Sequence, residues 1–231
     1  MSGILDDPSN TTEPEPGSDS DDDIKLSATA IAALQEFYTE QGIEQELLNQ
    51  AYTGKLDSFQ PQEDWQLSQF WYDARTADIL AREALAVAGD NGCIACVSSP
   101  TAYKRIRELR SNTVEVKCFE YDQRFQMYGQ DFIFYDFNDP LNLDMSLKNH
   151  FDVVVADPPF LSEECLTKTA ITVKFLAKDK IILCTGAVME TLAAKLLLAL
   201  PCQFKPTHQK RLENEFLCYT NYESKDLNSQ H

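Results

Sequence analysis

The amino-acid sequence predicts an α/β domain with a mostly parallel sheet, helices on both faces and an antiparallel hairpin at the C-terminal end. From Trp65 onward, short apolar runs alternate with segments of helical periodicity, which is the pattern of strand–helix–strand units. The run 151–156 holds three consecutive valines, as expected for a strand buried on both faces. Two strand-like segments, 202–206 and 215–222, close the chain with no helical pattern between them, so we expect them to pair antiparallel.

The first quarter of the chain differs in composition from the rest. Residues 1–25 are rich in Asp, Ser, Pro and Glu, and we expect them to be disordered. Ser27 is a candidate N-cap for a helix over 28–41, which Gly42 should end. The predicted divisions are an acidic tail of 1–25, an N-terminal helix and linker of 26–61, the wound domain of 62–223 and a disordered tail of 224–231.

Helix and strand signals then follow one another in regular order. Asp73 should cap a helix whose apolar residues recur at i, i+3 and i+4 until Gly89. Ser99 and Pro100 should begin the next helix, because proline suits a first helical turn, and Ser162 should cap a third. The predicted strands are 93–97, 114–119, 131–135, 151–156 and 180–184, and the last two helices are 162–177 and 189–200.

The charge of the chain argues against a nucleic-acid partner. The formal net charge is −17, and residues 1–23 hold eight acidic and no basic residues, which leaves −9 for the remainder. A negative surface repels phosphate backbones and favours a basic macromolecule. The acidic start does not resemble a signal peptide, and no stretch is apolar for long enough to span a membrane.

The seven cysteines lie mostly in apolar runs, which is typical of reduced thiols in a cytosolic or nuclear protein. Cys93 and Cys96 have CxxC spacing, but on a strand they face opposite sides, and no second pair or histidine cluster completes a zinc site. We therefore expect no metal.

Polar residues follow three of the predicted strands at their carboxyl ends, where ligands bind in open α/β sheets. Val97 and Ser98 lead into a helix N-terminus, which suits an anion such as a carboxylate. Glu120 ends the second strand, where an acid can bind both hydroxyls of a ribose; Asp122 is a nearby competitor. Asp136 follows the third strand and could accept a hydrogen bond from an adenine amino group.

The fourth strand ends in Asp157-Pro158-Pro159-Phe160, a rigid corner because proline fixes φ and lacks an N–H. It matches the Asp-Pro-Pro-aromatic signature of enzymes that methylate amino groups with S-adenosylmethionine (AdoMet). Asp157, which should also lie beside the cofactor, and the carbonyl of Pro158 can each accept an amine N–H and turn the lone pair toward the methyl. The ring of Phe160 can pack on the substrate. No general base other than Asp157 is evident.

Residues 65–72 hold four aromatic side chains just ahead of the wound domain's first helix. Trp71 and Tyr72 could form a core plug, or a lid over the cofactor or the target; the sequence favours neither.

Taken together, these stretches resemble the eukaryotic elongation factor 1-alpha lysine methyltransferases over most of residues 27–223. The matching motifs are LQEFY (34–38), WQLSQFWY (65–72), IACVS (94–98), FEYD (119–122), FIFY (132–135), ADPPFLSEEC (156–165) and LCTG (183–186).

The resemblance implies a Rossmann-like, seven-stranded class I fold and AdoMet-dependent methylation of a lysine on elongation factor 1-alpha, in the cytoplasm. That factor is basic, which suits an acidic enzyme. The family carries a serine-containing loop after its first strand, which agrees with the absence of glycine between Gly92 and Gly129. Many members have tyrosine where this chain has Phe160.

Two alternatives stay open. The same four-residue motif serves N6-adenine methyltransferases that act on DNA or RNA, and a glycine-free loop would also suit a non-catalytic, methyltransferase-like scaffold. We expect a monomer in each case.

Overall fold

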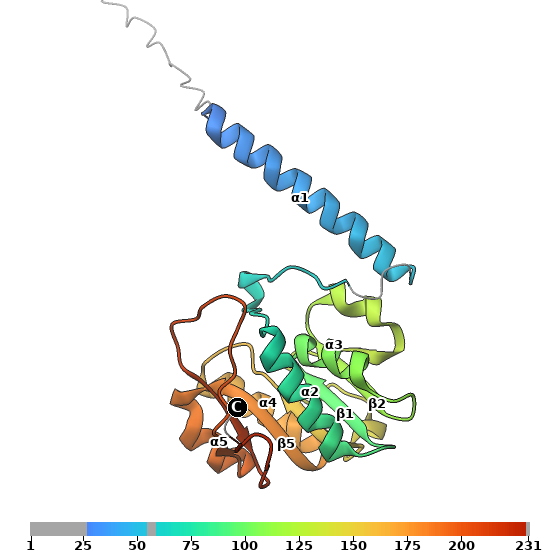
Figure 1. The fold of residues 1–231 in the computed structure, drawn as a ribbon, viewed down its shortest axis with the longest axis vertical. Helices are drawn as coiled ribbons and strands as arrows, with labels where there is room; N and C mark the ends of the chain where they lie inside the picture. The colour runs from blue at the N-terminus through green and yellow to red at the C-terminus, as the bar shows by residue number, and fades with distance from the viewer. Residues whose placement is uncertain (1–26, 55–58, 230–231) are drawn as a thin grey trace, which may run out of the picture. The chain divides into compact units, whose positions relative to one another are not determined.

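The computed structural model describes residues 27–54 and 59–229 and divides into two units, residues 1–42 and 43–231. The predicted tail of 1–25 lies outside the described residues. Helix α1 (Ala28–Tyr52) begins after Ser27, whose Oγ accepts the N–H of Ala30, and continues through Gly42 (Figure 1). The prediction that Gly42 ends this helix was wrong: an interior glycine costs about 1 kcal/mol, which the good helix formers after it offset.

The larger unit contains one seven-stranded sheet in the order β3-β2-β1-β4-β5-β7-β6. β1 to β5 are parallel, whereas β7 runs antiparallel to both β5 and β6. This is the predicted class of fold, with an antiparallel pair at one edge, although the first strand of that pair is Leu200–Pro201 and not the predicted 202–206. The strands are β1 (Cys93–Val97), β2 (Glu115–Glu120), β3 (Phe132–Phe134), β4 (Phe151–Ala156), β5 (Ala177–Gly186), β6 (Leu200–Pro201) and β7 (Phe216–Thr220).

Helices cover both faces of the sheet because alternate strand residues point to opposite sides. Ile94 and Cys96 belong to the same core as α2 and α3, whereas Ala95 and Val97 belong to the core under α4 and α5. Figure 1 shows α2 and α3 side by side over one face. The helices are α2 (Ala74–Ala88), α3 (Pro100–Leu109), α4 (Glu163–Leu176) and α5 (Glu190–Leu197). Over the described residues, we find no helix with the length and apolarity that a membrane crossing requires.

The caps follow the sequence signals. Asp73 accepts the N–H of Thr76 at 2.7 Å at the start of α2, and Gly89 ends that helix with a φ of 75°. Ser162 accepts the N–H of Cys165 at the start of α4. These side chains satisfy N–H groups that a helix leaves free.

The C-terminal segment differs from its prediction. We expected 224–231 to be disordered, but the described part, 224–229, packs against the domain. Leu227 is fully buried in the core under α2 and α3, and its carbonyl accepts the N–H of Phe204 at 2.9 Å. The burial of this leucine acts together with hydrogen bonds, such as the one that Gln203 N–H donates to Asn228 Oδ1 at 3.1 Å, to hold a short segment whose composition is otherwise polar.

We predict that Leu227→Ala lowers the free energy of unfolding by about 2–4 kcal/mol, because it removes a fully buried side chain. Urea denaturation measures the change. The matched control is Leu200→Ala, whose side chain is 64% exposed and whose loss should cost under about 1 kcal/mol. Equal effects of the two substitutions would contradict the packing of 224–229.

Candidate active site

A cavity of about 620 Å³ lies at the carboxyl edge of the parallel strands. Residues that follow β1, β2, β3 and β4 form its floor, and the segments 66–72 and 208–216 form its walls. The size is typical of a small-molecule site. Nearly all the predicted site residues line it: Ser98, Glu120, Asp136, Asp157, Pro158, Phe160, Trp71 and Tyr72.

Backbone hydrogen bonds beyond the strands bring these residues together. The N–H of Asp157 donates to Val97 at 3.0 Å, that of Ser98 donates to Phe119 at 2.8 Å, and that of Tyr135 donates to Glu120 at 3.1 Å. Val97 itself is fully buried and is not among the lining residues. Its part in the geometry is the carbonyl that holds Asp157, and its side chain belongs to the core.

The turn after β1 leaves a helix N-terminus open to the cavity. Ser98 has a φ of 52°, in the left-handed region that glycine usually occupies. Ser99 is the N-cap of α3, but its hydroxyl donates to the carbonyl of Val155 at 3.3 Å and caps no N–H of the helix. Ser99, Pro100 and Thr101 line the cavity, so the first turn of α3 faces it with the positive end of its dipole.

The two acids that follow β2 have different surroundings. Glu120 lines the cavity, and its Oε1 accepts the N–H groups of Tyr121 and Asp122 at 3.0 and 3.2 Å. Asp122 does not line the cavity: it pairs with Arg124 at 2.8 Å and accepts from Gln69, a lining residue, at 3.0 Å. Burial raises the pKa of Glu120 to about 7, and the charge of Asp122 adds to this rise.

Asp157 lines the cavity directly after the end of β4. Surrounding protein desolvates its carboxyl and raises its pKa to about 7, and the nearby charge of Glu120 acts in the same direction. The buried Tyr72 hydroxyl is close enough to lower that pKa, although it makes no hydrogen bond of normal geometry. Burial, together with the charge of Asp157, raises the pKa of Tyr72 well above its usual value, so this phenol stays protonated.

The remaining predicted site residues, Asp136, Pro158 and Phe160, also line the cavity. Asp136 accepts the N–H of Asn138 at 2.8 Å, which fixes its carboxylate at the rim. Pro158 is buried, and the ring of Phe160 is 41% exposed and packs edge-on against Phe137 at 5.7 Å. Phe160 therefore offers a free ring face to a ligand in the cavity.

Trp71 and Tyr72 both line the cavity but are held by the protein. The Trp71 indole N–H donates to the carbonyl of Pro61 at 3.0 Å, and its ring packs against Phe125. Tyr72 is 2% exposed. Both side chains thus belong to the domain core, as the first of the two interpretations has it, and they also form part of the cavity wall.

The charged side chains that line the cavity are acidic, over the residues that the structure describes. Among the described residues that line the cavity, four are acids and none is lysine or arginine. Such a cavity favours a cationic ligand and opposes phosphate groups. The acids are Glu120, Asp136, Asp157 and Glu213.

The wall formed by 208–216 contains no residue that the sequence predicted for the site. His208 and Phe216 line the cavity, and their rings lie 4.8 Å apart. His208 occurs in a polar loop with no periodicity or motif, so no signal in one sequence distinguishes it from a solvated histidine.

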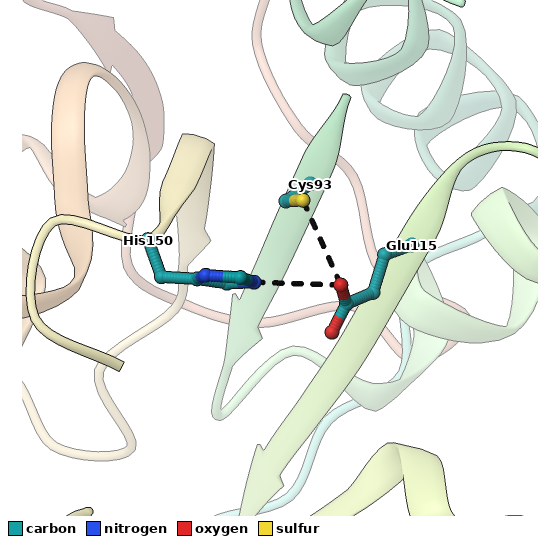
Figure 2. Close-up of side chains that lie close together, drawn as sticks. All are labelled: Cys93, Glu115 and His150. Atoms are coloured by element: carbon teal, nitrogen blue, oxygen red, sulfur yellow. Dashed lines mark hydrogen bonds and ion pairs between the residues drawn. The ribbon is translucent and has the colours of Figure 1, made fainter. Parts of the chain in front are cut away.

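A second cluster of potential ligands lies at the opposite edge of the sheet, where the parallel strands begin. Glu115 Oε2 is 3.4 Å from His150 Nε2 and 3.7 Å from Cys93 Sγ (Figure 2). The three groups are near enough to hold a metal ion, but the carboxylate already accepts from both neighbours and lies 3.7 Å from the Lys117 amine. We assign this cluster a structural role in joining strand starts.

A family model described as probable N6-adenine methyltransferase matches residues 63–224. A putative RNA methyltransferase from Pyrococcus horikoshii has 16% sequence identity and a TM-score of 0.48, over 77% of this chain and 96% of that one; a likeness this remote carries no argument about chemistry.

The curated relatives are much closer in sequence. EEF1A lysine methyltransferase 1 of Gallus gallus is 54% identical over 89% of this chain and 98% of that protein, and its Homo sapiens counterpart is 52% identical over 88% and 94%. Protein-lysine N-methyltransferase M142.8 of Caenorhabditis elegans is 41% identical over 90% and 98%. The chain therefore belongs to the methyltransferase family of the EEF1A lysine methyltransferases 1.

Proposed function

We propose that this chain transfers a methyl group from AdoMet to the ε-amino group of a lysine in EEF1A, the translation elongation factor 1-alpha. The acidic cavity at the Asp157-Pro158 corner is the observation that carries the proposal, since both the sulfonium of AdoMet and a lysine side chain are cations. The names of the curated relatives supply the substrate.

The lining residues fit the parts of AdoMet. The open N-terminus of α3 suits its carboxylate, Glu120 suits the ribose hydroxyls, and Asp136 at the rim suits the adenine amino group. The pKa of Glu120 and of Asp157, each raised to about 7, reflects the desolvation of the two carboxyls, and a bound cation would favour their charged forms. When bound, AdoMet supplies an electrophilic methyl group on a sulfonium.

The corner at Asp157 would orient the amine. The Asp157 carboxylate and the Pro158 carbonyl can each accept one N–H, which directs the nitrogen lone pair out of the corner. Pro158 and Pro159 keep these acceptors in place with no reorganisation during the reaction. The exposed ring of Phe160 can cover the lysine stem and interact with its positive charge.

The direct test is incubation of the purified protein with labelled AdoMet, EEF1A and adenine-containing oligonucleotides. We expect label on an EEF1A lysine, located by mass spectrometry, and none on the oligonucleotides. Label on adenine would favour the activity in the family model's description instead. A protein that binds no AdoMet by calorimetry would be a scaffold. We further propose that the chain acts as a monomer in the cytoplasm, where its substrate is.

We predict that Asp157→Asn lowers the rate of lysine methylation by roughly 10²-fold or more, because an amide can present an N–H where the amine needs an acceptor. Thermal unfolding should show a folded variant. The matched control is Asp179→Asn, which should keep the wild-type rate. Asp179 is an exposed acid near the start of β5 and does not line the cavity. A near-normal rate in Asp157→Asn would rule out the proposed corner.

We predict that Glu120→Gln weakens AdoMet binding by roughly tenfold to a hundredfold, the loss expected when a charged acceptor becomes neutral. Isothermal calorimetry measures this affinity. Asp122→Asn is the matched control: it should lower stability through the lost pairing with Arg124 and change affinity less. A larger loss of affinity in Asp122→Asn would exchange the roles of the two acids.

We predict that the buried Glu120 carboxyl makes the stability of the ligand-free protein depend on pH. Its pKa rises from 4.5 to about 7 on folding, so the folded state holds a proton that the unfolded state loses first, and stability falls as the pH rises between these values. Glu120→Gln lacks this loss. The variant should therefore gain stability relative to wild type from pH 4.5 to pH 7, by at most about 3 kcal/mol. Denaturant unfolding across this range measures the gap, and a constant gap would refute the burial effect.

A further inference from the structure

A lysine substrate enters this site as an ammonium ion and must lose one proton before it can react. Free lysine has a pKa of about 10.4, so nearly every side chain that enters at neutral pH is an ammonium without a lone pair. One proton must leave before the nitrogen can attack. Asp157 does not take this proton in the proposed scheme, because its carboxylate must remain the hydrogen-bond acceptor that holds the amine.

His208 lies in the cavity wall on a loop that is fixed from both sides. The carbonyl of Thr207 accepts the N–H of Asp73 at 3.1 Å, and the N–H of Gln209 donates to Trp71 at 2.8 Å. The Thr207 hydroxyl donates to the Asp73 carboxylate at 2.6 Å. These bonds join the loop to the chain on either side of Tyr72, so His208 is held in a defined position.

The surroundings of His208 keep its ring neutral. It is half-buried between the rings of Tyr72, 5.0 Å away, and Phe216, 4.8 Å away. Burial lowers the pKa of His208 below 6.5, although the charges of Asp73 and Glu63 oppose this change.

The other charged groups near this wall do not reverse the balance. Glu63 is paired with Lys210 at 2.6 Å. Asp157 and Glu213 line the same cavity, and the charges of Asp73 and Glu63 favour a proton on the His208 ring once it arrives. The imidazole is thus unprotonated before the substrate enters and sits among groups that tolerate its charged form.

We propose that His208 is the general base of this site and removes the proton from the incoming lysine ammonium. The inference rests on the proposed lysine methyltransferase function. One N–H bond of the ammonium breaks, its electron pair stays on nitrogen, and the proton bonds to a ring nitrogen of His208. The lone pair then forms the C–N bond while the C–S electrons remain on sulfur. The methylated lysine leaves as a cation, and His208 returns its proton to water.

Tyr72 is close to both acting groups and helps to position them. Its ring contacts His208, and its hydroxyl is near Asp157. An isolated bridge pairs Tyr72 with His208 along the backbone. The Tyr72 side chain and this bridge therefore fix the position of the imidazole relative to the Asp157 corner.

The test compares His208→Gln with His150→Gln, the histidine at the opposite edge of the sheet. His208→Gln should lower kcat for EEF1A by roughly 10²-fold and leave the AdoMet affinity, measured by calorimetry, within about twofold of wild type. The rate of His208→Gln should also rise about tenfold per pH unit through the alkaline range, where the free amine accumulates. His150→Gln should match wild type in rate and pH profile.

Two further readouts separate a proton acceptor from a merely structural residue. Added imidazole should restore part of the rate of His208→Ala and none of the rate of Asp157→Asn. The His208 ring resonance in NMR spectra of the wild type should titrate below pH 6.5.

The inference fails if His208→Gln keeps the wild-type rate and pH profile, or if imidazole rescues nothing while the variant is folded. A wild-type protein that methylates no lysine overturns the proposed function itself, and this outcome is distinguishable because it appears before any substitution is made.

Discussion

Three backbone hydrogen bonds just beyond the ends of the parallel strands hold the site together. Asp157, Ser98 and Tyr135 each donate an N–H to the chain across the ladder, so the four loops leave the sheet at neighbouring points. The parallel register alone would bring the strand ends to one edge. These added bonds fix where the carboxylate of Asp157 lies relative to the turn at Ser98 and to Glu120, and every proposed role depends on that placement.

The same site works against the stability of the empty protein. Glu120 and Asp157 are carboxyls whose burial raises the pKa of each to about 7, and no described lysine or arginine lines the cavity to compensate. By contrast Asp122, two residues from Glu120, is paired with Arg124. The fold thus neutralises the acid that serves structure and leaves uncompensated the acids that face the ligand. A bound cation would stabilise the charged forms of these carboxyls, and this stabilisation contributes to the free energy of ligand binding.

Much of this arrangement could be predicted from the sequence because the signals are local. Asp73, Ser162 and Pro100 mark helix starts through hydrogen bonds or a fixed φ within one turn, and the apolar run before Asp157 defines a buried strand. Gly42 was wrongly predicted to end α1. A glycine ends a helix only where the residues after it leave the helical conformation, and here the residues after Gly42 stay helical. Leu227 and His208 could not be predicted, because the contacts that bury Leu227 and hold His208 are made with residues far away in the sequence. Long-range contacts of this kind leave no periodicity.

A crystal structure of the complex with S-adenosylhomocysteine would show where the sulfur lies relative to the Asp157-Pro158 corner, and every proposed role depends on that position. We predict that the sulfur lies beside Asp157 and Pro158, with the ribose on Glu120 and the carboxylate at the first turn of α3. The space beyond the sulfur should be open toward His208. A nucleoside bound elsewhere, or a corner that faces away from the sulfur, would contradict the account.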